Sequence, residues 1–336
     1  MEKLVLGLSG GVDSAVAARL LGLRYAVTCL YLDIGLGGSG AQDAAAVADA
    51  LHLPFETMNI STALEAQVCA PFAADYFAGR TPLPCAHCNP RVKFPALLAV
   101  ADRIGARYVA TGHYARVEHG RLKKGMPAND QSYLLARLPK EQLARIMFPL
   151  GDYEKTAVRT LAEEFGLAVA HKPDSMEICF IPDGDYPAWL ERRGGTPPPG
   201  NFVDKSGRVL GRHRGIHAYT LGQRRGLGVC GPCRYFVSAI RPERNEVVLS
   251  DGGNLHSHRV FATGLNWLEE EALTAPRKVA VRLRHTKIET PAMLSPTDGG
   301  VLIQTEQPVR APTPGQLAVF YDGDYVMGSA WIDRAE

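Results

Sequence analysis

The chain has 336 residues, more than one hydrophobic core usually holds, and we expect two or three domains. Apolar residues make up 46% and charged residues 21%, which is typical of a globular protein, and no run of eighteen apolar residues is present to partner a membrane. The net charge of +2 does not by itself indicate a nucleic-acid-binding protein. An odd number of cysteines, seven, and the lack of a signal segment argue against a secreted protein held by disulfides, and we expect a cytoplasmic one.

The first predicted element is a strand that leads through a tight turn into a helix. An apolar run over 4–8 is followed by Ser9-Gly10-Gly11-Val12-Asp13-Ser14 and by a helical stretch over 15–21. Two glycines allow close approach of a ligand to the backbone, and the N-terminus of the helix attracts an anion. A carboxylate beside phosphates indicates a divalent cation. We therefore predict a pyrophosphate loop that binds the β- and γ-phosphates of ATP with Mg²⁺; a plain glycine-rich turn is the alternative, and the Walker and dinucleotide patterns are absent.

Strands and helices alternate through the first 150 residues. Apolar strands are predicted at 4–8, 26–32, 54–60 and 108–111, with helices between them such as 41–51 and 95–104. Pro95 suits the first turn of its helix, and Gly105 is expected to end it. This alternation predicts an α/β fold with a doubly wound parallel sheet, whose ligand lies at the carboxyl ends of the strands.

The pattern changes after residue 150. An amphipathic helix is predicted over 154–165, and a Gly- and Pro-rich segment over 194–200 indicates a linker. Short strands with Gly, Asp and Asn turns follow, which is typical of one or two small β-barrels. The expected domains are an ATP-binding domain over 1–150, a helical linker region carrying Cys179 over 151–200, a small β-domain over 201–262 and a C-terminal β-barrel over 263–336.

Two stretches of the β-rich part are basic and contain no acidic residue, namely 205–241 and 274–288. Four planar side chains interleave with the first stretch: His217, Tyr219, Tyr235 and Phe236. Cations mixed with planar groups suit a phosphate backbone and unstacked bases. The alternative is an ordinary solvated basic face.

Three cysteines suggest thiol chemistry. Cys85 and Cys88 form a Cys-x-x-Cys pair in a Pro-rich loop, and Cys179 lies in the segment 174–180. The pair alone fits zinc, a redox dithiol or an iron–sulfur ligand set. If Cys179 folds back onto this loop, three thiols converge near the nucleotide, which favours sulfur transfer. Cys29 and Cys69 have apolar neighbours and are expected to be buried and inert.

Taken together, these motifs resemble the tRNA-specific 2-thiouridylases, bacterial enzymes that place sulfur on the wobble uridine of certain tRNAs. The resemblance covers nearly the whole chain. The matching segments are Gly7–Ser14, Gly79–Pro82, Cys88–Asn89, Lys93–Phe94, Ala110–Tyr114, Asp130–Tyr133, Phe148–Gly151, Asp174–Ser175, Ile178–Phe180, Tyr219–Arg224 and Thr313–Gln316.

The resemblance implies ATP-dependent 2-thiolation of uridine 34 through an adenylated uridine, with Cys88 as nucleophile and Cys179 as the carrier of a persulfide. ATP and Mg²⁺ are the implied cofactors, and tRNA and a persulfide-carrying donor protein or sulfide are the implied partners. The implied ATP-binding residues are Gly7, Leu8, Ser9, Gly10, Gly11, Val12, Asp13, Ser14, Leu32 and Gly112. The implied RNA-contacting residues are Leu83, Pro84, Cys85, His113, Asn129, Asp130, Gln131, Arg282, Leu283 and Gln316. Lys93 and His113 are further candidates to neutralise phosphate charge, and a buried histidine is the alternative for His113.

The chain departs from the family pattern at the segment that meets the target base. Leu83-Pro84-Cys85 stands where many members have Asn-Pro-Asp, which changes the hydrogen-bonding groups available there. The extra thiol opens a second route, in which Cys85, Cys88 and Cys179 bind a [4Fe–4S] cluster that replaces the persulfide. Leu32 stands where the family often has Met. The pair Cys230 and Cys233 resembles a thioredoxin motif without its helix, so a labile disulfide and plain surface thiols both stay open.

Two other functions remain compatible with parts of the sequence. A pyrophosphate-loop synthetase acting on a small carboxylate would use ATP but would need neither Cys88 nor Cys179. A non-catalytic RNA-binding protein with a vestigial loop would need neither the thiols nor an intact Ser9–Ser14 segment. The sequence carries no indication of the oligomeric state.

Overall fold

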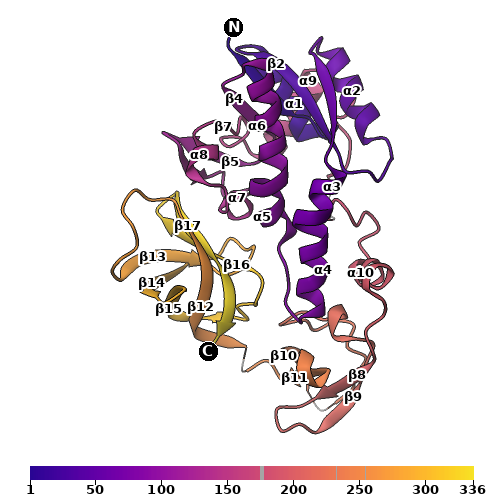
Figure 1. The fold of residues 1–336 in the computed structure, drawn as a ribbon, viewed down its shortest axis with the longest axis vertical. Coiled ribbons are helices and arrows are strands. Elements are labelled where there is room, and N and C mark those ends of the chain that lie inside the picture. The colour runs from indigo at the N-terminus through magenta and orange to yellow at the C-terminus, as the bar shows by residue number, and fades with distance from the viewer. Residues whose placement is uncertain (175–177, 232, 254) are drawn as a thin grey trace. The chain divides into compact units, whose positions relative to one another are not determined.

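The computed structural model describes residues 1–174, 178–231, 233–253 and 255–336, and the chain forms two compact units (Figure 1). Unit 1 comprises Met1–Val68, Cys85–Met176 and Tyr321–Met327. Unit 2 comprises Cys69–Pro84, Glu177–Phe320 and Gly328–Glu336. Within the described ranges, no helix is both long and apolar enough to cross a membrane.

Unit 1 contains a five-stranded, entirely parallel sheet in the order β3-β2-β1-β4-β7. Its strands are β1 (Lys3–Gly7), β2 (Ala26–Asp33), β3 (Phe55–Asn59), β4 (Tyr108–Thr111) and β7 (Ile146–Met147). The first four confirm the predicted strands to within one or two residues at each end. The strand order reverses between β1 and β4, and in such sheets the crevice at this point binds the ligand.

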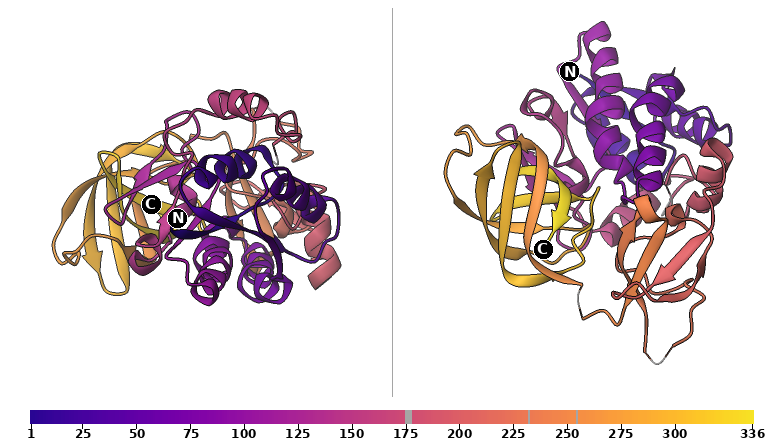
Figure 2. Two further views of the ribbon diagram at one scale, coloured as in Figure 1. Left: turned by 90° about the horizontal axis from the view of Figure 1, so that it is seen from above. Right: turned by 60° about the horizontal axis from the view of Figure 1, so that its bottom comes forward.

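Helices cover both faces of this sheet, as the left view of Figure 2 shows. These helices are α1 (Val12–Gly22), α2 (Gly40–Ala50), α6 (Phe94–Ile104) and α9 (Lys155–Glu164). Leu4 and Leu6 of β1 lie in a core that includes side chains of α1, α2 and α9, whereas Gly7 faces Leu97 of α6. A strand alternates its faces with every residue, so β1 is buried on both sides. These helices confirm the doubly wound arrangement.

The Cys-x-x-Cys segment is helical, which corrects the predicted loop. Pro84–Cys88 forms α5, continues as a π-helical turn over Asn89–Lys93 and runs into α6. Proline is favoured in the first turn of a helix, and a π-turn accommodates the missing N–H of Pro90. Gly105 ends α6 in the left-handed conformation with φ of 70°, as predicted.

The rest of unit 1 consists of short elements. They are α3 (Ser61–Leu64) with the start of a π-helical turn (Glu65–Cys69), the hairpin β5 (Ala115–Glu118) and β6 (Arg121–Lys124), α7 (Ser132–Leu135) and α8 (Lys140–Leu143). Tyr325 of β17 pairs with Lys123 of β6. The sequence analysis predicted none of these elements.

Unit 2 holds two β-structures and two helices. The helices are α4 (Ala70–Phe77) and α10 (Tyr186–Gly194), and residues 195–199 after α10 have no regular structure, in line with the predicted linker. The smaller sheet has the order β10-β11-β8-β9. Its strands are β8 (Gly200–Val203), β9 (Val209–His213), β10 (Phe236–Arg241) and β11 (Glu246–Ser250), with 3₁₀ turns at Ile216–Ala218 and Pro242–Arg244.

Six C-terminal strands form a barrel in the order β12-β15-β14-β13-β16-β17, which a β12–β17 pairing closes. They are β12 (His256–Trp267), β13 (Arg277–Arg282), β14 (Thr290–Thr297), β15 (Gly300–Arg310), β16 (Leu317–Asp322) and β17 (Tyr325–Ala335). Closure leaves no free edge among these strands. The predicted all-β C-terminal part is confirmed.

Candidate active site

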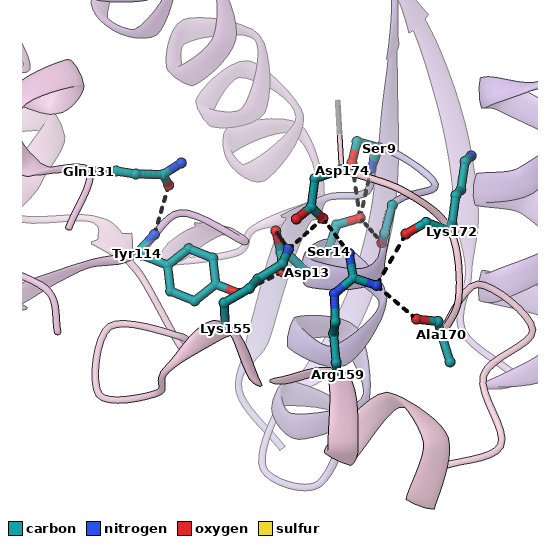
Figure 3. A network of polar contacts seen from close by, with 11 residues as sticks. Ser9, Asp13, Ser14, Tyr114, Gln131, Lys155, Arg159, Ala170, Lys172 and Asp174 are labelled. Carbon is teal, nitrogen blue, oxygen red and sulfur yellow. Dashed lines mark hydrogen bonds and ion pairs between the residues drawn. The ribbon is translucent and has the colours of Figure 1, made fainter. Parts of the chain in front are cut away.

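The predicted pyrophosphate loop connects β1 to α1 at the carboxyl edge of the parallel sheet (Figure 3). The Ser14 hydroxyl donates to the Gly11 carbonyl (3.0 Å), accepts from the Ser9 N–H (3.2 Å) and lies 3.1 Å from the Ser9 hydroxyl. Gly10 has φ of +74°, which favours glycine. Because α1 begins at Val12, its first N–H groups have no partner within the helix and face the loop. These amides and hydroxyls suit the phosphates of ATP.

Two glycines allow the loop to pack closely against its neighbours. A Cβ on Gly112, which directly follows β4, would lie 3.0 Å from the Asp13 carbonyl carbon and 3.0 Å from the Ser14 nitrogen. A Cβ on Gly10 would lie 2.9 Å from the Gly40 oxygen at the start of α2. The structure therefore brings Gly112 to the loop, as the family resemblance implies.

The other implied nucleotide-binding residues lie in the strands beside the loop. The Leu8 N–H donates to the Leu30 carbonyl (2.9 Å), and the Leu8 side chain is buried. Leu32, near the end of β2, is half-buried and pairs with Met58 of β3. Both residues therefore lie at the carboxyl edge of the sheet, beside the loop.

Asp13 is the centre of a polar network that the sequence analysis missed. Its carboxylate accepts from the Tyr114 hydroxyl (2.6 Å) and from the Lys155 ammonium (2.7 and 2.8 Å). Lys155 also pairs with Asp174 (2.8 Å), and Arg159 pairs with Asp174 (3.0 Å). Burial raises the pKa of Asp174, but Lys155 and Arg159 outweigh it and hold this pKa below its usual value. Burial and the neighbouring Asp13 carboxylate raise the pKa of Tyr114.

A second lysine braces the other side of the loop. The Lys172 ammonium donates to the Gly10 carbonyl (3.0 Å) and to the Asp43 carboxylate (2.5 Å). Hydrogen bonds from Lys172 and Ser39 lower the pKa of Asp43. The Arg159 guanidinium donates to the carbonyls of Ala170 (3.2 Å) and Lys172 (3.3 Å), which fixes the segment that carries Lys172.

The groups around the loop suit a magnesium ion that is bound together with a nucleotide. Mg²⁺ prefers oxygen ligands and is usually held by one or two carboxylates plus substrate phosphates. Asp13 supplies such a carboxylate beside the phosphate-binding amides. Within the described ranges, no group of three or more His, Cys, Asp and Glu side chains forms a cage for a metal ion. The residues therefore fit a metal that arrives with the phosphates.

Cys85 and Cys88 lie one helical turn apart in α5, where residues three apart share a face. Cys85 is exposed and Cys88 is half-buried. Burial raises the pKa of Cys88, whereas the positive charge of Lys93 and a hydrogen bond from the Lys93 backbone oppose this rise. The thiolate is the nucleophilic form, so Lys93 favours the reactive state of Cys88.

The surroundings of His113 bear on the two alternatives that the sequence left open for it. Its Nδ1 lies 2.7 Å from the Thr111 hydroxyl, and its ring packs near Phe94 and Phe148. Burial and the nearby Lys93 charge hold the pKa of His113 well below its usual value. This low pKa and the contact with Thr111 favour the alternative of a buried, hydrogen-bonded histidine over a role in neutralising phosphate charge.

Two of the remaining cysteines confirm the expectation that they are buried. Cys29 and Cys69 are buried, and burial raises the pKa of Cys29 to about 12, so its thiol is inert near neutral pH.

Cys179 belongs to unit 2 and is exposed; the next residue, Phe180, packs on Phe72 and Trp189 with ring centroids 5.3 Å from each. Ser175–Glu177 of the Cys179 segment lie outside the described residues. Cys230 and Cys233 are exposed thiols, and Pro232 between them also lies outside the described residues.

Three implied RNA contacts instead organise the neighbourhood of the loop. The Asp130 carboxylate accepts from the Gly125 and Ser132 N–H groups, both at 3.0 Å. The Gln131 side chain accepts from the Tyr114 N–H (2.9 Å). The Asn129 amide, oriented to satisfy both its atoms, accepts from the Lys155 N–H (2.6 Å) at the start of α9. Gln131 and Asn129 therefore hold Tyr114 and Lys155, the two partners of Asp13.

In unit 2, Gln316 positions the chain that leads to Leu83 and Pro84. Its amide donates to the carbonyls of Thr81 (3.0 Å) and Pro82 (3.2 Å). Leu83 and Pro84 are themselves half-buried. The neighbouring Gly315 has φ of +91°, and a Cβ there would lie 2.9 Å from the Thr81 oxygen. The C-terminal barrel thus fixes the segment just before α5.

Several residues of the basic stretches have structural partners. Arg282 is 6% exposed and pairs with Glu289 (2.7 Å), and Leu283 is 3% exposed. Arg284 donates to the carbonyls of Leu221 and Ala311 and to the Thr313 hydroxyl. The interpretation of Tyr219 and His217 as planar RNA-facing groups is wrong, because both are buried in unit 2, His217 against Glu191.

Other basic residues are exposed and line a cavity in unit 2. Arg224, Arg225 and Arg234 are exposed. Arg224, Arg234 and Tyr235 line a cavity of about 400 Å³ together with Gly226, Leu227, Gly228, Val229 and Cys233. This surface keeps the combination of cations and a planar ring that the sequence analysis associated with RNA.

Nearly the whole chain is similar to known proteins of one family. Family models match residues 2–183 (tRNA methyl transferase HUP domain), 188–251 (tRNA methyl transferase PRC-barrel domain) and 257–332 (aminomethyltransferase beta-barrel domain). Proteins named tRNA-specific 2-thiouridylase MnmA are similar over nearly their full lengths. That of Heliobacterium modesticaldum is 43% identical, covering 99% of this chain and 93% of the relative. That of Lachnoclostridium phytofermentans is 41% identical (99% of each), and that of Syntrophotalea carbinolica 43% (98% of each). The chain therefore belongs to the tRNA-specific 2-thiouridylase family.

Proposed function

We propose that this protein is a tRNA uridine 2-sulfurtransferase, which thiolates the wobble uridine at position 34 at the expense of ATP. The observation that carries the proposal is a pyrophosphate loop, complete with Asp13 and Gly112, in the same unit as the helical thiol pair Cys85 and Cys88. A synthetase for small carboxylates has no use for these thiols, and a vestigial loop has no need of the contacts that hold Asp13. We place the enzyme in the cytoplasm, together with its tRNA substrate.

In the first half of the reaction, the uridine O2 attacks the α-phosphate of ATP. This step makes O2 a good leaving group and C2 a better electrophile. Pyrophosphate departs into the loop, where the N–H groups of α1 and the hydroxyls of Ser9 and Ser14 donate hydrogen bonds that stabilise its growing negative charge. Bound Mg²⁺ would spread the charge of the phosphates, with Asp13 as its protein ligand.

In the second half, a persulfide on Cys179 attacks C2 of the adenylated uridine. The terminal sulfur bonds to C2, and AMP leaves with the C2–O2 bonding electrons. The Cys88 thiolate then attacks the Cys179 sulfur, which breaks the S–S bond and leaves the terminal sulfur on the base. The products are 2-thiouridine and a Cys88–Cys179 disulfide, which an external thiol reduces before the next cycle. A persulfide-carrying protein recharges the Cys179 thiol by transferring its terminal sulfur, and the cysteine of the donor leaves as a thiol. Free sulfide would instead attack the Cys179 sulfur of the Cys88–Cys179 disulfide, which forms the Cys179 persulfide and releases the Cys88 thiolate.

We assign tRNA contact to two groups of residues. The first is the base-reading segment Leu83, Pro84 and Cys85, which follows Thr81 and Pro82, the two residues that the Gln316 amide contacts. The second is the exposed arginine surface of unit 2 at Arg224, Arg225 and Arg234. Asn129 and Gln131 contribute by holding Lys155 and Tyr114, and Asp130 by binding the N–H groups of Gly125 and Ser132. Arg282 and Leu283 contribute by stabilising the barrel. His113 contributes as a neutral group.

A second route of sulfur delivery would need Cys85, Cys88 and Cys179 to come together, although the described residues contain no ready-made group of three metal ligands. Cys85, Cys88 and Cys179 supply three thiolates, which is the ligand number for a [4Fe–4S] cluster with one open iron. Such a cluster would hold the incoming sulfur in place of the persulfide. The exposed Cys85, which the persulfide route leaves unused, favours this alternative. Anaerobic purification followed by iron and sulfide assay separates the two routes. Bound iron that Cys85→Ala removes together with activity supports the cluster; full thiolation by Cys85→Ala and an iron-free parent protein support the persulfide.

The function is tested by incubating the protein with unmodified tRNA, ATP, Mg²⁺ and a persulfide source. We expect 2-thiouridine in the nuclease digest by mass spectrometry, and AMP and pyrophosphate in equal amounts. Cys88→Ser and Cys179→Ser should each abolish thiolation. Adenylate formation on a small carboxylate without tRNA would favour the synthetase, and tRNA binding without ATP cleavage would favour the RNA-binding protein.

A further inference from the structure

The pyrophosphate loop lacks the lysine that Walker loops use on phosphates, but another part of unit 1 brings a lysine to it. Lys155 is the first residue of α9, and its ammonium lies 2.7 and 2.8 Å from the Asp13 oxygens (Figure 3). Asp13 is in the first turn of α1, where the backbone N–H groups face the anion site. The lysine therefore lies beside the place where the phosphates bind.

We propose that Lys155 is a phosphate-binding residue of this loop, which pairs with Asp13 only while no nucleotide is bound. This inference deepens the proposed function and rests on it. Without nucleotide, the ammonium neutralises a carboxylate that would otherwise repel phosphate. With magnesium and nucleotide bound, Asp13 turns to the metal, and Lys155 pairs with the departing pyrophosphate.

The surroundings of Lys155 allow such an exchange of partners. Its second carboxylate, Asp174, is also paired with Arg159, so Asp174 keeps a cation when Lys155 turns away. The Tyr114 hydroxyl also donates to the Asp13 carboxylate, so Asp13 keeps a hydrogen bond when Lys155 turns away. The backbone of Lys155 is fixed by Asn129, whereas its side chain has four rotatable bonds. Rotation of the side chain alone therefore moves the charge over a few ångströms.

Lys172 has a different role in the same loop. Its ammonium donates to the Gly10 carbonyl (3.0 Å) and to Asp43 (2.5 Å), which joins the turn to α2. A cation bound to a backbone carbonyl of the turn holds its shape. We therefore assign phosphate binding to Lys155 and bracing of the loop to Lys172.

Binding of inorganic pyrophosphate to the purified full-length protein, measured by calorimetry with and without Mg²⁺, tests the inference. Lys155→Met should weaken binding of magnesium pyrophosphate about tenfold or more, because a charged hydrogen bond to phosphate is lost. Lys155→Arg keeps the charge and should stay within about threefold of the parent. Lys3→Met, an exposed change at the amino end of β1, whereas the loop follows the carboxyl end, is the matched control and should have no effect.

A double-mutant cycle separates the lysine from the general effect of removing a carboxylate. Asp13→Asn releases Lys155 and removes a negative charge, so metal-free pyrophosphate should bind about fivefold tighter or more. The double variant Asp13→Asn with Lys155→Met should lose most of this gain.

The outcomes distinguish this inference from the function it rests on. Lys155→Met binding within about twofold of the parent, or a double variant as tight as Asp13→Asn, would overturn the role of Lys155 and leave the function intact. Equal losses in Lys155→Met and Lys155→Arg would also overturn it, because the effect would then come from packing. A parent protein that binds neither pyrophosphate nor ATP would overturn the pyrophosphate-loop function itself.

Discussion

Asp13 combines two demands that conflict in an isolated loop. In the proposed mechanism its carboxylate binds a divalent cation, yet it lies in the first turn of α1, where backbone N–H groups would attract phosphate. The hydrogen bonds from Lys155 and Tyr114 balance the charge of this carboxylate. We expect Asp13→Ala to reduce tRNA-dependent release of AMP about a hundredfold or more, because the metal loses its protein ligand.

Release of AMP and pyrophosphate in the presence of tRNA measures this effect. Asp102→Ala is a suitable control, because Asp102 lies on the same unit, is largely exposed and pairs only at the surface with Arg145. Normal adenylation by Asp13→Ala would remove the residue from its role beside the metal and phosphates.

Cys88 should show a pH dependence that Lys93 controls. Burial raises the Cys88 pKa, so the thiolate fraction and the alkylation rate should still be rising above neutral pH. Lys93 acts in the opposite direction and lowers this pKa. Lys93→Met should therefore move the whole pH–rate curve upward in pH and slow alkylation severalfold at pH 7.

Iodoacetamide labelling of the Cys88 peptide, followed by mass spectrometry over a range of pH, measures the curve. A Cys85→Ser background removes the neighbouring thiol, and Lys3→Met controls for a general loss of positive charge. A curve that Lys93→Met leaves in place, or moves downward in pH, would contradict the electrostatic coupling.

At this scale the sequence predicts the groups that lie close together along the chain. Ser9–Ser14 was recognisable because its glycines and hydroxyls are contiguous and follow a strand. Lys155 was not, since it lies 142 positions from Asp13, and a lone lysine near a helix start is usually a surface residue. The neutral state of His113 depends on burial and on Lys93, which only the fold brings near it.

Close packing between elements gives Gly112 its importance. The residue directly follows β4, and a Cβ there would lie 3.0 Å from backbone atoms of Asp13 and Ser14. Backbone atoms cannot turn away as a flexible side chain does, so the β1–α1 loop must shift. We expect Gly112→Ala to destabilise the protein by about 1–3 kcal/mol and to weaken ATP binding about tenfold.

Thermal unfolding and ATP titration measure the two effects together. Gly22→Ala, at the end of α1, is the matched control, because a Cβ there would make an ordinary 3.8 Å contact with the Leu53 side chain. It should leave ATP affinity unchanged and stability unchanged or raised by up to about 1 kcal/mol. Unchanged ATP affinity in Gly112→Ala would show that the loop tolerates a displacement there.

Regular elements with clear end signals were predictable, and short irregular ones were not. The strands β1 to β4 follow apolar runs, and Pro95 and Gly105 delimit α6. The helix α5 was missed, because Pro84, Pro90 and Pro95 within a dozen residues suggest a loop. In the structure Pro84 begins α5, Pro90 lies in the π-turn and Pro95 lies in the first turn of α6. In α3 and α4 the apolar residues lie on either side of another π-turn, which disrupts the regular helical period.

Over the whole molecule, the exposed basic surface is smaller than the sequence suggests, because several arginines of the basic stretches are paired with acids. The acid-free stretches look uniformly basic, but acids just outside them supply partners: Asp204 for Arg208, Glu246 for Arg241 and Glu289 for Arg282. Pairing across strands and turns is set by the sheet register, which a count of charges along the chain does not contain. The exposed arginines near the 400 Å³ cavity are the better candidates for binding RNA.

This difference leads to opposite expectations for two sets of arginines. Neutralising exposed Arg224 and Arg225 to glutamine should weaken tRNA binding and reduce the slope of log affinity against log salt by about 1.5, because each phosphate contact releases counterions. Arg282→Gln should instead leave Glu289 in a partly buried site without its cation and reduce stability by about 3 kcal/mol, with the salt slope unchanged. Filter binding at several salt concentrations and thermal unfolding separate the two effects. A flattened slope in Arg282→Gln alone would place RNA contact on the barrel strand, whereas an unchanged slope in the Arg224/Arg225 variant would remove the exposed arginine surface from the tRNA interface.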